Sequence, residues 1–335
     1  MSKIRKKTHP NSCKKIVCFA GGSVVPKIIL KPFKDLGFDM VGITSMVDNG
    51  GSTGALRKDL GVLPTGDIRR HLLALSDLTK GEEWKEKLWN FRFGKTEISP
   101  GHFGHNFANF FMSGLECVLG DFEKSLKITS QFLNVKGRAL PVTLDNIQLV
   151  AELEDGSLVR GEDEIDVGKN HNRDSSIKKI YLNPGGRVYP KAKKEIKSAD
   201  FIIIGPGDLY SSLLPCFLAE GATEAVSKSK AKKIFICPAM TKNGETSGFS
   251  VNKFCQEVEK YINCPLDFVI YNNVYPGNDR VAEYKKQGEF LDELLVAEDG
   301  LNKGKFIGAD VLTSSGLIVH DSKKLIKVIK KICKL

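Results

Sequence analysis

Three short apolar stretches of this chain each end in a cluster of glycine and hydroxyl residues. KIVCF leads into AGGSVV, MVGITSM leads into VDNGGSTG, and FIIIG leads into PGDLYSS. Apolar stretches of this length are typical of buried strands, and segments with helical periodicity lie between them. Strands that alternate with helices predict an α/β fold, in which a mainly parallel sheet is covered by helices on both faces.

The segment around residues 140–180 interrupts this alternation. Its sequence NIQLVAELEDGSLVRGEDEI reads as two strands joined at Asp155-Gly156, a dipeptide that favours hairpin turns. Residues 322–335 predict an amphipathic helix that docks on the protein rather than in a membrane. Because no linker or repeat divides the chain, we expect a basic arm at residues 1–14 and a single domain at 15–335 with a β-hairpin excursion.

The positive charge of the chain is concentrated at its two ends. Of the formal net charge of +10, residues 1–15 contribute +6 and residues 321–335 contribute +5, so the rest is close to neutral. A nucleic-acid binder needs a continuous basic face, and we therefore expect no nucleic-acid partner. No apolar run reaches the roughly 18 residues of a membrane span. The eight cysteines include no C-x-x-C pair, which indicates buried thiols in a reducing cytoplasm rather than a zinc site.

The glycine clusters have the composition of phosphate-binding loops. In open α/β sheets, ligands bind beyond the carboxyl ends of strands, where helix N-termini offer free N–H groups and a partial positive charge. None of the clusters matches a standard nucleotide fingerprint, since there is no P-loop and Tyr210 stands where GPG would need a third glycine. A tight structural turn is the alternative for each cluster alone, but three in one sheet favour a phosphate site.

Polar side chains of suitable chemistry accompany these clusters. Asp48 directly follows a strand, where a carboxylate can face a ribose hydroxyl, a metal ion or an attacking hydroxyl, unless it only forms an Asx turn. Asp67 stands at a helix start, where capping is the alternative role. His102 and His105 are three residues apart, but no third ligand has a suitable spacing, so no metal site is expected there. Residues 241–250, TKNGETSGFS, again place hydroxyls, an acid and glycines after a strand.

Five ordered motifs resemble those of a known family. They are DNGGSTGALRKDLGVLPTGDIRRHLLALSD, GHNFANFF, GRALPVTLDN, IIIGPGDLYSSLLP and NGETSGFS, and the resemblance extends from about residue 15 to residue 325. On these motifs the chain is similar to the family that joins the gluconeogenesis factor YvcK with CofD, the 2-phospho-L-lactate transferase.

The two branches of this family imply different functions. The stretch from GGSTG to TGDIR looks like the YvcK branch, whose members resemble cytoplasmic, nucleotide-sugar-binding regulators of carbon flow, cell-wall precursor supply and cell shape. The CofD branch implies a magnesium-dependent transfer of a 2-phospholactyl group from a guanosine diphosphate adduct to a deazaflavin alcohol. Pro26-Lys27 after the first loop is similar to the CofD form. Three positions depart from the family pattern, namely Val24 for a glycine, Asn49 for the second acid of an Asp pair, and the lack of an arginine before His320.

We therefore predict a Rossmann-like three-layer sandwich that binds a UDP-sugar or a similar nucleotide diphosphate, with the CofD-like transferase as the alternative. Magnesium is expected only for the transferase, in which Asp48 and Asp67 would position it as catalytic residues. The expected partner is a small nucleotide-type molecule, and a homodimer is left open. The predicted ligand-binding residues are Gly21, Gly22, Ser23, Asp48, Asn49, Gly50, Gly51, Ser52, Thr53, Arg57, Asp67, Arg69, His105, Asn106, Gly205, Gly207, Asp208, Ser211, Thr241, Glu245 and Tyr284.

Overall fold

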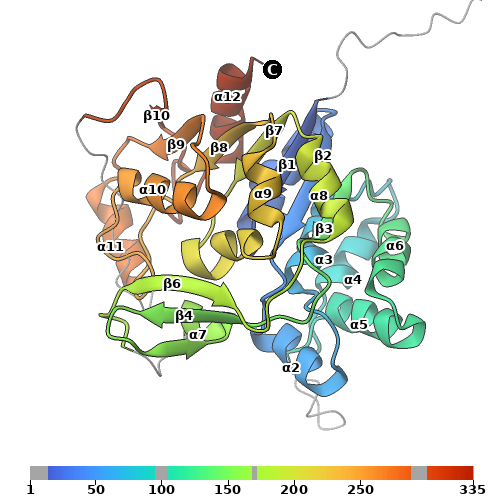
Figure 1. Cartoon of the computed structure of the whole chain (residues 1–335). Coiled ribbons are helices and arrows are strands. Elements are labelled where there is room, and N and C mark those ends of the chain that lie inside the picture. Colours follow the sequence, from blue (N-terminus) through green and yellow to red (C-terminus); the bar gives the residue numbers. More distant parts are fainter. Residues whose placement is uncertain (1–13, 95–103, 168–171, 288–299, 335) are drawn as a thin grey trace, which may run out of the picture.

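The computed structural model describes residues 14–94, 104–167, 172–287 and 300–334 (Figure 1). Seven strands form the main sheet, and every neighbouring pair in it is parallel. This arrangement confirms the predicted α/β fold class. In spatial order the strands are β10 (Phe306–Ala309), β9 (Phe268–Asn272), β8 (Lys232–Ile236), β7 (Phe201–Ile204), β1 (Lys15–Phe19), β2 (Asp39–Thr44) and β3 (Arg138–Pro141).

The strand order locates the ligand-binding edge of the main sheet. The chain runs outward from β1 through β2 to β3, and then returns to place β7 on the other side of β1. In open sheets, ligands bind beyond the carboxyl ends of the strands that flank such a reversal. Val17 of β1 pairs with Val41 of β2 and with Ile202 of β7. The three glycine clusters follow these three strands, and so they begin side by side.

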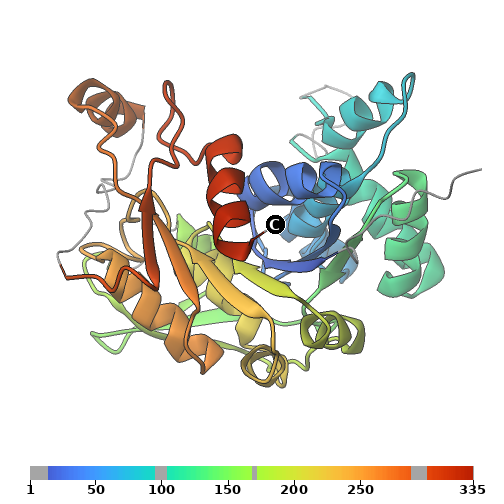
Figure 2. The ribbon, with the colours of Figure 1, turned by 90° about the horizontal axis from the view of Figure 1, so that it is seen from above.

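Helices cover both faces of the main sheet (Figure 2). One face carries η1 (Pro26–Leu30), α1 (Lys31–Asp35), α3 (Gly66–Leu75) and α12 (Ser322–Cys333), and the other carries α8 (Pro190–Lys197), α9 (Ala222–Ser227) and α10 (Val251–Ile262). The helices α4 (Glu83–Asn90), α5 (Phe107–Leu119) and α6 (Phe122–Phe132) pack beyond α3, and α2 (Gly51–Leu60) packs on α5. Two short helical turns, η3 (Leu209–Leu213) and η4 (Leu214–Phe217), follow β7.

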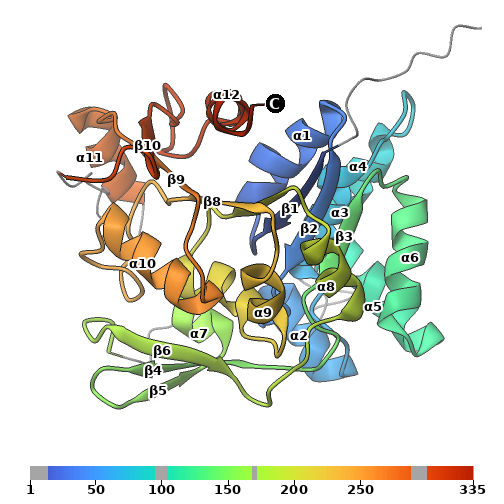
Figure 3. The same ribbon diagram turned by 45° about the horizontal axis from the view of Figure 1, so that its top comes forward.

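A small antiparallel sheet lies beyond the carboxyl ends of the main strands, next to α2 (Figures 1 and 3). It consists of β5 (Leu158–Arg160), β4 (Leu149–Leu153) and β6 (Ile177–Leu182), in that order. The turn predicted at Asp155-Gly156 is confirmed, with Gly156 at a φ of +86°. The prediction that GEDEI continues a strand was wrong, because Gly161 turns the chain with a φ of +99° into the short helix α7 (Glu162–Asp166). This helix brings acidic residues to the sheet edge.

The C-terminal helix α12 docks on the main body as predicted. Leu325 and Ile329 are buried, and the Ser322 hydroxyl donates a hydrogen bond to the Ile28 carbonyl at 3.0 Å. Within the described residues, no helix combines the length and the hydrophobicity needed to cross a membrane.

The two tryptophans of α4 differ sharply in burial. Trp89 is fully buried, donates its indole N–H to the Arg69 carbonyl at 3.0 Å, and contacts the rings of Phe111 and Phe132. Trp84 is 53% exposed. Because the Trp89 indole bonds to the backbone carbonyl of Arg69, the packing of Trp89 helps to fix the position of Arg69 in the candidate site.

Truncating these two side chains should therefore have very different effects. We expect Trp89→Ala to lower the free energy of unfolding by about 3–5 kcal/mol, the usual cost of emptying an aromatic core site. Trp84→Ala is the matched control, and we expect it to cost about 1 kcal/mol or less, since it loses only edge contacts. Urea denaturation followed by circular dichroism measures both. Equal losses for the two variants would contradict this account of the core.

Candidate functional site

A cavity of about 370 Å³ lies where the loops after β1, β2 and β7 meet. We call it the main cavity. Its walls include Gly22, the start of α2, Arg69, Glu162 and Asp208. The strand reversal described above therefore coincides with a real hollow in the molecule.

The N-terminus of α2 points into the main cavity without a side-chain cap. Gly50 is extended, and Gly51 begins the helix with a φ of +45°, a conformation that glycine adopts at no steric cost. Within the described part of the chain, no side chain caps the backbone N–H groups at the start of this helix. Free N–H groups and the positive end of the helix dipole give this end an affinity for anions.

Ser52 and Thr53 fasten α2 to α5. The Ser52 hydroxyl oxygen accepts hydrogen bonds from the Asn106 backbone N–H at 3.2 Å and the Asn109 side-chain amide at 3.1 Å. Its own proton is then available for Nδ1 of His105, 3.0 Å away. Asn106 caps α5 and also donates to the Trp89 carbonyl at 3.2 Å. The predicted residues Ser52, His105 and Asn106 thus come together as a hydrogen-bonded support for the helix start.

Asp67 ties the first glycine loop to α3. Its Oδ1 accepts hydrogen bonds from the Gly22 backbone N–H and from Arg70, both at 2.8 Å. A Cβ on Gly21 would lie 2.9 Å from Oδ2 of Asp67, so a larger residue there would displace this carboxylate. The loop N–H at Gly22 is therefore bonded to a protein carboxylate, while the exposed Ser23 lines a neighbouring cavity.

The third loop is held by Glu245, which lies far along the chain. The buried Glu245 carboxylate accepts hydrogen bonds from the backbone N–H groups of Tyr210 at 2.9 Å and Ser211 at 3.2 Å, and from the Ser211 hydroxyl at 2.9 Å. A protein carboxylate thus occupies the helix-start position that was predicted for a phosphate. Gly205, with a φ of +79°, and Gly207 shape the turn that leads to it.

Two other predicted residues join the second loop to the small sheet. Asn49 accepts a hydrogen bond from the Asp163 backbone N–H at 3.0 Å. Arg57 donates to the Asp48 carbonyl at 2.9 Å and to the Ile147 carbonyl at 2.7 Å. Both side chains are engaged in holding protein segments together.

Three carboxylates crowd one wall of the main cavity. Asp48 is half-buried, accepts a hydrogen bond from the Gly50 backbone N–H at 3.1 Å, and reaches the start of α3, where a Cβ on Gly66 would lie 2.0 Å from its Oδ2. Burial, with the nearby charge of Asp67, raises the pKa of Asp48 to about 6. Burial and the charges of Asp48 and Asp67 raise the pKa of Glu162 to about 8. Sequence reasoning missed Glu162, because its helix was read as strand.

A second acidic cluster already contains a cation. Asp166, Asp208 and Glu245 place carboxylate oxygens within 4.8 Å of one another. Nζ of Lys242 lies 3.0 Å from Asp208 and 3.4 Å from Glu245, and it also contacts Asp166. The ammonium group therefore stands where these carboxylates would otherwise hold a metal ion. Lys242 lies one residue after the predicted Thr241 but was not itself predicted.

The buried Arg69 also lines the main cavity. Arg69 is 5% exposed, its Nε has no hydrogen-bond partner, and it forms no ion pair with any residue that the structure describes. Burial, with the neighbouring charges of Arg70 and Arg92, lowers the pKa of Arg69 to about 10. Burying a charge without a paired anion is costly. Arg92 lines the cavity as well, as does Arg70, which is ion-paired with Asp67 at 2.8 Å. The unpaired Arg69 makes this part of the cavity suited to a negatively charged ligand.

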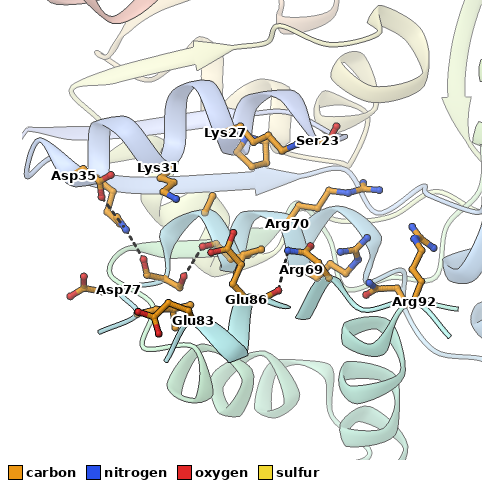
Figure 4. A pocket seen from close by; sticks show the side chains of 18 residues that line it. Ser23, Lys27, Lys31, Asp35, Arg69, Arg70, Asp77, Glu83, Glu86 and Arg92 are labelled. Atoms are coloured by element: carbon orange, nitrogen blue, oxygen red, sulfur yellow. Dashed lines mark hydrogen bonds and ion pairs between the residues drawn. The ribbon is translucent and has the colours of Figure 1, made fainter. Parts of the chain in front are cut away.

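Two further cavities adjoin the main one. A cavity of about 290 Å³ shares Asp208 with it and is lined by Gly207, Thr241 and His320; we call it the His320 cavity. His320 is 6% exposed, its Nε2 has no partner among the described residues, and burial lowers its pKa to about 4. The second, about 710 Å³, shares Arg69, Arg70 and Arg92 with the main cavity and is called the side cavity (Figure 4). The predicted Tyr284 lies in α11 (Asn278–Gln287), but its side chain is outside the described part of the chain.

Comparison with known proteins identifies the family. The model of the family described as 2-phospho-L-lactate transferase CofD matches residues 16–314. Gluconeogenesis factors of Halalkalibacterium halodurans and Bacillus subtilis (strain 168) are 34% and 32% identical, over 94% and 96% of this chain and 95% and 98% of their own. The chain belongs to this family of gluconeogenesis factors and CofD. The resemblance inferred from the five motifs is thereby confirmed.

Members of the family extend the likeness to the whole chain. A protein of Thermotoga maritima is 36% identical over 324 residues, which cover 95% of this chain and 99% of that protein. A crystal structure of a UPF0052 family protein from Bacillus halodurans matches with a TM-score of 0.84 at 30% identity, covering 95% of this chain and 99% of that chain. The fold is therefore shared with these relatives over nearly the whole chain.

The raised pKa of Glu162 makes a prediction about stability. The unfolded chain ionises Glu162 near pH 4.3, whereas the folded protein keeps the proton up to about pH 8, so ionisation increasingly opposes folding as the pH rises between these values. We expect Glu162→Gln to raise the free energy of unfolding by about 1–3 kcal/mol at pH 8 and by almost nothing at pH 4.5. Glu164→Gln, on the same short helix, is the comparison variant. Thermal unfolding across this pH range measures the change in stability. A stabilisation by Glu162→Gln at pH 4.5 as large as at pH 8 would contradict the raised pKa of Glu162.

Proposed function

We propose that this protein binds a nucleotide sugar, of the UDP-sugar kind, and acts as a regulator of carbon metabolism and cell-wall precursor supply in the cytoplasm. The observation that supports the proposal is the buried charge of Arg69, which forms no ion pair within the described residues and lines the same cavity as the N-terminus of α2. An unpaired buried guanidinium destabilises the folded protein, and a bound anion would offset this loss of stability.

A diphosphate fits these two features together. Backbone N–H groups at the start of α2 can donate to phosphate oxygens, and a guanidinium forms bidentate, charge-assisted hydrogen bonds with the same group. Arg70 and Arg92 line the same wall and add positive charge around it. These donors belong to the protein, so the diphosphate does not need a metal ion to be held.

The rest of a nucleotide has suitable surroundings on either side. The carboxyl oxygens of Asp48 and Glu162 can accept hydrogen bonds from sugar hydroxyl groups. The His320 cavity has walls that include Pro206, Pro238 and Ile318, and a flat heterocyclic base would pack against such apolar surfaces. We place the base there and the ribose between the two cavities.

The regulatory role rests on the family members to which the chain is similar. The relatives from H. halodurans and B. subtilis are named as gluconeogenesis factors, and they align over nearly the whole of this chain. Asn49 adds support, because its amide oxygen bonds to the backbone of Asp163 and is therefore engaged within the protein. A binding protein needs no second acid at this position.

One observation favours the transferase as a second candidate. Asp48, Asp67 and Glu162 all line the main cavity, and burial together with the charge of neighbouring carboxylates raises the pKa of Asp48 and of Glu162. Magnesium binds carboxylate oxygens, so these three residues would hold the ion if they moved closer together, because they are not a group whose oxygens already lie within 4.8 Å of one another. Bound magnesium would neutralise charge that develops on a phosphate during transfer to an acceptor hydroxyl.

Arg69 gives the first test of nucleotide-sugar binding. We expect Arg69→Met to weaken UDP-glucose binding by about tenfold to hundredfold, the value of a charge-assisted hydrogen bond. Because the charge is buried and unpaired, the variant should be at least as stable as the wild type. Arg160→Met, on the exposed edge of β5, is the matched control. Calorimetric titration measures affinity, and an unchanged Kd in Arg69→Met would sink the assignment.

Metal dependence separates the regulator from the transferase. We expect the Kd for UDP-glucose to stay within about twofold when EDTA is added, because backbone N–H groups and arginines suffice to bind a diphosphate. We also expect no transfer of a phospholactyl group from a guanosine diphosphate adduct to a deazaflavin alcohol, with or without magnesium. Product analysis by mass spectrometry checks this. Magnesium-dependent turnover would contradict the proposed regulatory function and support the transferase function instead.

A further inference from the structure

The side cavity, at about 710 Å³, is larger than the main cavity and the His320 cavity. The proposed function does not yet assign it a ligand group. It lies between the η1–α1 segment on one side and α3 and α4 on the other (Figure 4). Because it shares Arg69, Arg70 and Arg92 with the main cavity, the two hollows meet at these arginines. A ligand whose phosphates sit at the arginines can therefore extend a further group into the side cavity.

Charge is distributed unevenly along this cavity. Figure 4 shows the three arginines at one end and the carboxylates of Asp35, Asp77 and Glu83 towards the other, with Glu86 between them. Lys27, Lys31 and Lys34 also line the cavity, and Lys34 forms an ion pair with Asp35 at 3.1 Å, so hydrogen-bond donors and acceptors lie side by side beyond the arginines. This mixed lining favours a neutral polar group that both donates and accepts hydrogen bonds.

The walls of the side cavity are not only charged. Pro26, Leu73 and Ala74 contribute apolar surface, and Asn90 contributes an amide. Alternating apolar patches and hydrogen-bond acceptors suit a ring with hydroxyl groups at its edge and C–H groups on its face. A sugar ring has this character, whereas a flat apolar ring would leave the carboxylates without partners.

Arg69 connects this chemistry to the ligand proposed above. It is buried, it forms no ion pair within the described residues, and its guanidinium forms part of the wall of both cavities. We infer that the side cavity receives the sugar of the nucleotide sugar, with the distal phosphate at Arg69 and the sugar hydroxyls at Glu86 and Asp77. This inference rests on the proposed function and adds where the sugar binds and what recognises it.

The test compares a nucleotide with its sugar-bearing form. Calorimetric titration with UDP, UDP-glucose and UDP-N-acetylglucosamine is carried out on the full chain and on Glu86→Leu and Asp77→Leu. Both residues are exposed, so the variants should fold, which thermal unfolding verifies. We expect each variant to weaken the preferred UDP-sugar by about tenfold while changing UDP by less than about twofold. Glu154→Leu, an exposed carboxylate in the turn after β4, should change neither ligand.

The outcomes separate the inference from the proposed function. If the wild type binds a UDP-sugar but Glu86→Leu and Asp77→Leu bind it equally well, the sugar lies elsewhere, and only the inference is overturned. Equal weakening of UDP and the UDP-sugar would also overturn it, because the cavity would then contact the nucleotide. If the wild type binds none of the three ligands, the proposed function fails and the inference fails with it.

Discussion

The hydrogen bonds made by Asp67 determine how the candidate site is assembled. One carboxylate oxygen accepts from the backbone of the first glycine loop and from Arg70, so it joins the end of β1 to the first turn of α3. The position of α3 in turn places Arg69, which lies between the main and side cavities. The Trp89 indole also bonds to the Arg69 carbonyl and so restrains the backbone at this residue. A small set of polar contacts thus fixes a buried charge that no local preference would place there.

The parts of the fold that depend on local pattern could be predicted from the sequence. Buried strands, the turn at Asp155-Gly156 and the docked C-terminal helix all follow from apolar periodicity and turn chemistry. The short helix α7 could not, because its acidic residues follow a strand with only Gly161 to mark the change. Its five residues offer too few positions for helical periodicity to show.

The sequence predicted which residues lie at the candidate site better than it predicted what each of them binds. The sequence indicated which loops meet, and the strand order brings those loops together. It did not indicate that Glu245 bonds to the start of η3 or that Asn106 caps α5, since a carboxylate or an amide satisfies such a position as well as a ligand does. Which side chain fills a helix start is decided by tertiary contacts between distant segments.

Lys242 neutralises the acidic cluster beside the main cavity whatever the concentration of free cations in solution. A dissolved ion must reach its carboxylates by diffusion, and its occupancy falls when its concentration falls. The ammonium group of Lys242 is attached to the chain next to Asp208 and Glu245, so its effective concentration there is in the millimolar range or above whatever the solution contains. An external cation would have to compete with that tethered group. The charge balance on this side of the site is therefore built into the polypeptide.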